Sequence, residues 1–122
     1  MSNTSILPSH GPPVGNVTKA GAITMDLEHR RVWVENRFIS LAPKDFELLK
    51  VLLEAKGDTV SRYAIFEKVW GSEKSFESAS RIVDAHILRL RQKLGAEGRR
   101  ILTVKHVGYR FDVVREWIRF GP

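Results

Sequence analysis

Apolar and polar residues alternate along residues 22–41 with the period of two that is typical of β-strands. Two polar turns, residues 28–30 and 35–37, interrupt the alternation. Trp33 stands between two valines, so its side chain should point to the other face of the sheet. The pattern predicts an antiparallel meander of three or four short strands. Its apolar members are Ile23, Met25, Leu27, Val32, Val34, Phe38, Ile39 and Leu41.

The apolar spacing changes to three and four after Leu41, which predicts two helices. Pro43 suits the first turn of a helix, where its missing N–H costs nothing, and Gly57 ends the pattern. Ser61 offers a side-chain oxygen that can cap the second helix, and Gly71 ends it. The apolar stripes are Phe46, Leu49, Leu52 and Leu53, then Ile65, Phe66, Val69 and Trp70. Residues 72–76 are predicted to form a loop.

A third helix is predicted over residues 77–94 because its apolar residues recur at intervals of three and four. These residues are Ala79, Val83, Ile87, Leu90 and Leu94. The opposite face is basic and partly small, with Arg91 and Lys93 on its flanks. It carries Ser78, Arg81, Ala85, Leu88, Arg89 and Gln92. A helix with one apolar and one basic face suggests that the basic face meets a partner.

Residues 101–105 and 109–113 alternate around a turn that contains Gly108, which predicts a β-hairpin after a polar loop at residues 95–100. Its basic residues Lys105, His106 and Arg110 lie at or near the tip. Strands, three helices and a hairpin predict an α+β fold. We interpret it as a winged helix-turn-helix with an N-terminal antiparallel sheet, a three-helix core and a C-terminal β-hairpin, the wing.

The 122 residues fit one domain, predicted at residues 22–114, with a flexible tail or linker at residues 1–21 and an extension at residues 115–122. Residues 1–21 are rich in Pro, Gly, Ser and Thr. The first twenty residues are not expected to form a signal peptide, and no segment approaches the roughly 20 apolar residues that span a bilayer. No membrane partner is expected, and the cytoplasm is the expected location.

Lys and Arg number 20 against 14 Asp and Glu, so the formal net charge is +6. An anionic partner is therefore expected, with nucleic acid ahead of an anionic membrane surface. The sequence has no cysteine, which excludes disulfides and thiolate chemistry. The four histidines show no metal-binding spacing, no nucleophile has an evident base, and no glycine loop could hold a phosphate. Neither a metal, a cofactor nor catalysis is expected.

The third helix and the hairpin carry side chains that are suited to binding DNA. Arg81 and Arg89 share one helical face, and an arginine fork can bond guanine or a phosphate in a fixed geometry, while the small Ala85 lets the helix approach the bases. Four residues can neutralise phosphates: Arg91, Lys93, Lys105 and Arg110. Polar donors that can position the domain on the DNA backbone are Ser61, Trp70, Thr103 and Tyr109.

Each of these features has a plainer interpretation. A basic helix face is often only a solvated face. Trp70 can be a core residue with its indole N–H at the rim, and Tyr109 can pack on the third helix. His86 lies at the edge of the apolar stripe, where a hydrogen-bonded structural histidine is expected rather than a ligand or a base.

Four stretches together resemble the OmpR/PhoB-type winged-helix DNA-binding domain of bacterial response regulators. They are SLAPKDFELLKVLL, VSRYAIFEKVWG, SRIVDAHILRLRQKL and ILTVKHVGYRFDV, within residues 23–114. The resemblance implies that the third helix is the recognition helix. It implies that Arg89 contacts bases, that Arg81, Arg91 and Trp70 contact phosphates, and that Thr103 and Tyr109 contact the DNA backbone. Lys105 stands where relatives usually have a minor-groove arginine, and His106 replaces the usual wing glycine.

The resemblance also implies partners. The loop before the third helix, with Glu73, Lys74 and Phe76, often contacts RNA polymerase in the family, and a bare surface loop is the alternative. Members usually carry a phosphoacceptor receiver domain, for which 122 residues leave no room, so we expect either the isolated effector part of a longer regulator or a stand-alone regulator that is controlled by something other than phosphorylation. The expected function is sequence-specific binding of double-stranded DNA by a transcription regulator, as two copies on directly repeated half-sites. The alternative is an interaction module that docks on RNA polymerase or another regulator and binds DNA weakly or not at all.

Overall fold

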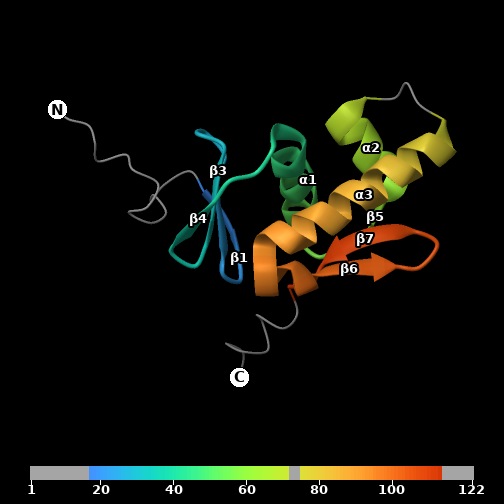
Figure 1. The fold of residues 1–122 in the computed structure, drawn as a ribbon. Helices are drawn as coiled ribbons and strands as arrows, with labels where there is room; N and C mark the ends of the chain where they lie inside the picture. The colour runs from blue at the N-terminus through green and yellow to red at the C-terminus, as the bar shows by residue number, and fades with distance from the viewer. Residues whose placement is uncertain (1–16, 72–74, 114–122) are drawn as a thin grey trace.

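The computed structural model describes residues 17–71 and 75–113, in which two small antiparallel sheets flank three α-helices (Figure 1). The first sheet contains β1 (Val17–Ala20), β2 (Ile23–Asp26), β3 (Arg31–Val34) and β4 (Arg37–Ile39). The helices are α1 (Pro43–Glu54), α2 (Arg62–Trp70) and α3 (Phe76–Leu94). The remaining elements are β5 (Val60–Ser61), the 3₁₀ helix η3 (Gly95–Arg100), β6 (Ile101–Val104) and β7 (Gly108–Phe111).

The N-terminal sheet is the predicted meander, with the order β1-β2-β3-β4. Trp33 lies opposite Thr24 on β2 and Phe38 on β4, while its neighbours Val32 and Val34 belong to the core cluster, so its side chain lies on the other face of the sheet, as the alternation predicted. Asp26 shapes the turn after β2, because its Oδ1 accepts hydrogen bonds from the backbone N–H groups of Glu28 and His29, each at 3.1 Å. The prediction was wrong for residues 17–20, which form β1 instead of belonging to the tail.

The sequence pattern did not predict β1, because β1 lies at the edge of the sheet. Its register pairs Val17 with Asp26 and Ala20 with Ile23, so its backbone is held by β2. Only Ala20 of this strand is fully buried. A strand with so few apolar positions has no alternation that could separate it from the polar residues before it.

The helix starts follow from the capping residues. Pro43 occupies the first turn of α1, and the Ser61 Oγ accepts a hydrogen bond from the Ala64 N–H at 3.0 Å at the start of α2, as predicted. The Ser75 Oγ accepts from the Ser78 N–H at 3.3 Å and caps α3. The helix therefore begins at Phe76, and the predicted loop was wrong for this residue. In the described part of the chain no helix is long and apolar enough to cross a membrane.

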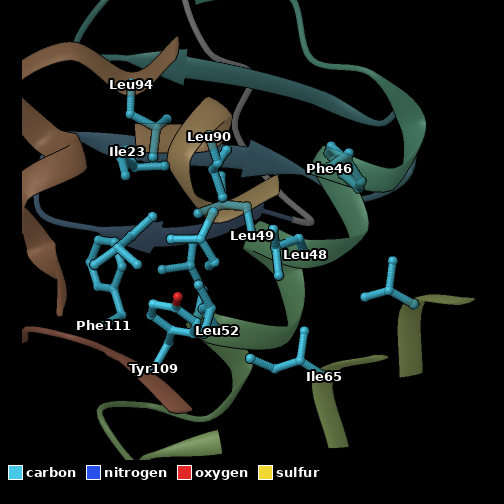
Figure 2. Packing of buried hydrophobic residues seen from close by; sticks show 14 of the residues in the cluster. Ile23, Phe46, Leu48, Leu49, Leu52, Ile65, Leu90, Leu94, Tyr109 and Phe111 are labelled. Atoms are coloured by element: carbon cyan, nitrogen blue, oxygen red, sulfur yellow. The ribbon is translucent and has the colours of Figure 1, made fainter. Parts of the chain in front are cut away.

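The core lies between the first sheet, α1, α3 and the second sheet. All five residues of the predicted α3 stripe are buried, from Ala79 to Leu94. Figure 2 shows Leu49 of α1, Leu90 of α3 and Ile23 of β2 pointing toward one another, with Phe111 of β7 below them. Because one face of α3 is fully used by this core, its opposite face must lie at the surface.

The second sheet has the order β5-β7-β6, and the β6–β7 hairpin is the predicted wing. Both wing strands are shorter than predicted, since Lys105 belongs to the turn and β7 ends at Phe111. Gly108 is required where β5 pairs with β7 of the wing, because a Cβ there would lie 2.0 Å from the Val60 carbonyl oxygen. His106 holds the left-handed turn position, with φ 68°, that a glycine would adopt without strain.

Residues 95–100 form the 3₁₀ helix η3 and not the predicted polar loop. Gly98 and Arg100 are buried in it. The Arg100 guanidinium lies against the Gly21 turn, and Glu97 accepts a hydrogen bond from the Ala22 N–H at 3.4 Å. This element joins the end of α3 to the N-terminal sheet, which explains why a polar sequence adopts a fixed structure.

Candidate nucleic-acid interface

The surface of α3 that faces away from the core carries an ordered row of side chains, which we call the outer stripe: Arg81, Ala85, Leu88 and Gln92. These residues follow one another at intervals of four, three and four, so they lie along a single line on the helix. All four are exposed, while the opposing stripe is buried. The structure thus brings together the exposed face that the sequence predicted, along a helix of 19 residues, or about 28 Å.

Arg89 lies beside the outer stripe and is tied to a buried carboxylate. Its Nε donates to Asp45 Oδ2 at 2.9 Å and its Nη2 donates to Asp45 Oδ1 at 3.3 Å. The Arg89 side chain keeps 49% of its surface exposed, whereas that of Asp45 keeps 1%. The arginine is therefore fixed at one side and open to solvent at the other.

His86 completes this cluster, with its Nδ1 2.8 Å from Asp45 Oδ1. Burial alone would raise the pKa of Asp45, but the hydrogen bonds and charges of Arg89 and His86 outweigh it and hold the pKa below its usual range. Asp45 is thus ionised and acts as an acceptor, while His86 Nδ1 also lies 3.0 Å from Arg89 Nη2, so the three side chains form one cluster. His86 is the hydrogen-bonded structural histidine that the sequence suggested.

A second set of hydrogen bonds connects the wing to α3. The Arg91 guanidinium donates to the Ile101 carbonyl oxygen at 2.6 and 3.1 Å and to Thr103 Oγ1 at 3.0 Å. The Tyr109 hydroxyl donates to Asp84 Oδ1 at 2.5 Å. These contacts set the position of the wing relative to α3.

Tyr109 is the least exposed of the predicted site residues. Burial and the hydrogen bond to Asp84 raise its pKa, so the phenol stays a protonated donor. Arg62 shares the same acceptor, because its Nε donates to Asp84 Oδ1 at 2.8 Å. Tyr109 thus packs on α3, which is the plainer of the two sequence interpretations.

The remaining basic residues lie at several points around the outer stripe and the wing. Lys105 and His106 are exposed in the wing turn. Arg110 is half-buried, with its Nε donating to the Gly57 carbonyl oxygen at 3.0 Å. The exposed Lys93 donates from Nζ to the Ser40 carbonyl oxygen at 3.4 Å. One exposed cation, Lys105, therefore lies at the wing tip beside His106, and Arg110 lies farther down the wing.

Trp70 is partly buried and not a free surface residue. Its ring stacks on Phe66, with centroids 5.4 Å apart, and meets the edge of His86 at 4.8 Å. Within residues 17–71 and 75–113 its indole N–H has no hydrogen-bond acceptor, so this donor is available at the rim. Both sequence interpretations of Trp70, core packing and a donor at the surface, are compatible with this placement.

Phe76 is 62% exposed and lies near Tyr63, with ring centroids 6.4 Å apart. Glu73 and Lys74, the other two predicted polymerase contacts, lie outside the described residues. No group of three His, Cys, Asp or Glu side chains within the described ranges could hold a metal ion.

Sequence reasoning missed the acidic residues that hold the site. Asp45 occupies the first turn of α1, where an acid is common because it favours the helix N-terminus, so the residue gave no reason to suspect a buried ion pair. Asp84 lies four residues before Leu88 on an exposed flank. Both acids find their partners on elements distant in sequence, which periodicity cannot detect.

Comparisons with known proteins agree with this architecture. A family model described as "Transcriptional regulatory protein, C terminal" matches residues 35–111. The transcriptional regulatory protein ResD of Bacillus subtilis is 34% identical over 108 residues, covering 85% of this chain and 44% of ResD. The probable transcriptional regulator ycf27 of Pyropia yezoensis is 33% identical over 114 residues, covering 91% of this chain and 47% of ycf27. The chain thus spans about half the length of these curated relatives.

Among solved structures, the DNA-binding domain of RstA from Klebsiella pneumoniae, in complex with the RstA box, is 31% identical. The likeness has a TM-score of 0.70 and covers 80% of this chain and 97% of the RstA domain. The chain therefore belongs to the family of OmpR/PhoB-type DNA-binding domains found at the C-terminal end of transcriptional regulatory proteins, which are transcription regulators and not enzymes.

Proposed function

We propose that this domain binds double-stranded DNA sequence-specifically, with α3 in the major groove and the wing at the adjacent minor groove. The observation that carries the proposal is the outer stripe, a fully exposed face on a helix whose opposite face is buried in the core. An α-helix fits the major groove, where side chains can distinguish all four base pairs. The RstA domain, a relative of the same fold, is a DNA-binding domain in complex with its RstA box, which supports DNA as the partner.

The charge distribution supports a nucleic-acid partner. Arg81 and Lys93 are exposed on α3, and Lys105 is exposed at the wing tip. Such cations displace counterions from phosphates, which provides affinity without sequence preference. In the proposed complex these residues hold the domain in register on the DNA backbone.

Arg89 is the candidate for direct contact with a base. Asp45 accepts from its Nε and Nη2, and Nη2 also lies 3.0 Å from His86 Nδ1, which leaves the Nη1 group for a guanine acceptor. Because Asp45 is buried and ionised, it holds the guanidinium in one orientation before DNA arrives. An arginine fixed in advance loses less side-chain freedom on binding.

Selection of bound duplexes from a random DNA pool tests the proposal. The wild-type domain should enrich one sequence motif, and Arg89→Ala should lose the preference at one or two base pairs and bind the selected site roughly tenfold or more weakly. Arg89→Lys is the matched variant, because it keeps a charge beside Asp45 and loses the planar fork. Recovery of the same motif with Arg89→Ala would exclude the assigned role, and absence of any motif would exclude sequence-specific binding.

The same selection tests how many copies bind. The family resemblance favours two copies on directly repeated half-sites. A recovered motif that contains the same half-site twice in the same orientation would support this arrangement. A single half-site, or two inverted ones, would contradict it.

One observation favours a second function, docking on a protein such as RNA polymerase. Phe76 is 62% exposed at the start of α3, and burial of an exposed apolar ring against a protein partner is favourable. A pulldown with polymerase subunits, beside a DNA titration at two salt concentrations, separates the two functions. Polymerase capture without salt-sensitive DNA binding would favour the interaction module.

A further inference from the structure

Leu88 is an apolar side chain in the middle of the outer stripe, and 58% of its surface is exposed. Its neighbours in the stripe are Ala85, three residues before it, and Gln92, four residues after it. The buried stripe from Ala79 to Leu94 already supplies the contacts between α3 and the core. Leu88 therefore contributes little to folding, and its exposure needs another explanation.

The surroundings of Leu88 are cationic. Arg81 and Arg89 lie within two helical turns of it, and both are exposed. The nearby carboxylate of Asp84 is engaged, because its Oδ1 accepts from Arg62 and from Tyr109. The surface thus presents an apolar spot, made by Leu88 and Ala85, inside a positively charged frame.

A partner that matches this surface must be anionic and must offer an apolar group in a groove that admits a helix. The major groove of DNA meets both conditions, since phosphates line it and the 5-methyl group of thymine projects into it. A purely apolar protein groove would leave Arg81 without an anionic partner and would cover the solvent-exposed side of the Arg89 guanidinium, which is costly at an interface.

We propose that Leu88, together with Ala85, contacts the 5-methyl group of a thymine and thereby specifies a T·A pair within the half-site. This inference rests on the proposed function, because it requires α3 to lie in the major groove. It adds a specificity determinant that makes no hydrogen bond and that carries no charge. Discrimination at this position comes from apolar contact and from exclusion of water.

Deoxyuridine provides the test, because it keeps every hydrogen-bonding group of thymine and lacks only the methyl group. The site recovered by selection is synthesised with single thymine-to-deoxyuridine replacements, and binding by the full chain is measured for each duplex. The wild-type chain should bind one such duplex about three- to fivefold more weakly, as expected for loss of one buried methyl group. Leu88→Ala should bind the thymine and deoxyuridine duplexes equally.

Val107→Ala is the matched control variant. Val107 is also an exposed apolar residue, but it lies in the wing turn, and the thymine methyl group does not reach the minor groove. Its thymine-to-deoxyuridine ratio should equal that of the wild type. Because the side chains of Leu88 and Val107 are exposed, truncation of either should leave the fold intact.

The outcomes separate this inference from the proposed function. Wild-type binding with no loss at any deoxyuridine position would overturn the role of Leu88 and leave sequence-specific binding in place. A loss that persists unchanged in Leu88→Ala would also overturn it, because another residue would then contact the methyl group. Absence of binding to any duplex would overturn both, and capture of a protein partner that Leu88→Ala abolishes would then assign this surface to that partner.

Discussion

At the scale of single residues, Asp45 connects stability and the DNA-facing surface. A buried carboxylate persists only if its oxygens accept enough hydrogen bonds to offset the loss of water. Arg89 and His86 supply these bonds from α3, so one acid on α1 fixes two side chains of the neighbouring helix. The contribution of Asp45 to stability can therefore be measured with a single substitution.

We expect Asp45→Asn to lower the free energy of unfolding by about 2–4 kcal/mol at pH 7, because the amide leaves Arg89 without its counter-ion and is itself poorly paired. The pKa of Asp45 is below its usual range in the fold. Its contribution is therefore present above the unfolded pKa, near 4, and is lost as the pH falls through the folded value. Denaturant titrations of both proteins between pH 7 and pH 2 check this.

Asp26 is a second carboxylate whose protonation must be separated from that of Asp45. Its pKa is also lowered, because the Glu28 and His29 hydrogen bonds outweigh the effect of its burial, so wild type loses stability in acid through more than one group. The difference between wild type and Asp45→Asn isolates the contribution of Asp45. A difference that stays constant down to pH 2 would contradict the ionised state assigned to this carboxylate.

At the scale of elements, close contacts between backbone segments fix structures that no local sequence signal predicts. In η3, a Cβ on Gly98 would lie 2.2 Å from the Arg91 carbonyl oxygen, so glycine is required where the 3₁₀ helix returns against α3. The same neighbourhood holds Arg91, whose guanidinium positions the wing. A change at Gly98 should therefore act on stability through the backbone of α3.

Gly98→Ala should lower the free energy of unfolding by about 3 kcal/mol, because the backbone of α3 must move to admit the methyl group. Ala96→Ser is the matched control. It also adds one heavy atom, but at an exposed position of the same element, and should change stability by no more than about 0.5 kcal/mol. Thermal or denaturant unfolding measures both, and equal effects would show that the contact at Gly98 is not limiting.

The elements that the sequence predicted are those with a local signal. The α3 stripe, the Ser61 cap and the alternation around Trp33 each depend on residues within a few positions of one another, and all three are confirmed. The missed elements depend on distant partners. Thus β5 exists because Val60 pairs with Tyr109, and η3 is fixed because Arg100 reaches the Gly21 turn.

The candidate site divides in the same way. Exposure of Arg81 and Ala85 follows from helical period, so sequence predicted it. The ion pair of Arg89 with Asp45 depends on how α1 crosses α3, which no spacing within either helix specifies. The burial of Tyr109 likewise depends on the position of Asp84.

At the scale of the whole molecule, the proposed orientation makes the position of each exposed positive charge matter. The N-terminal sheet lies at one end of the described structure, and the tip of the wing lies at the other (Figure 1). Lys105 is exposed at that tip, and Arg81 is exposed on α3. If the proposed orientation is right, the effect of removing a charge should depend on which end of the molecule loses it, although the net charge changes equally.

Lys105→Ala should weaken binding to all DNA sequences alike and reduce the slope of log affinity against log salt concentration by about one, because one phosphate contact and its released counterion are lost. Arg37→Ala is the matched control, since Arg37 is an exposed cation on β4 in the N-terminal sheet, far from the wing tip (Figure 1). Its slope should equal that of the wild type. Binding titrations from about 50 to 200 mM salt, on the selected site and on unrelated DNA, measure both variants. Equal slopes for Lys105→Ala and Arg37→Ala would mean that the wing does not contact the phosphates and that only the overall charge matters.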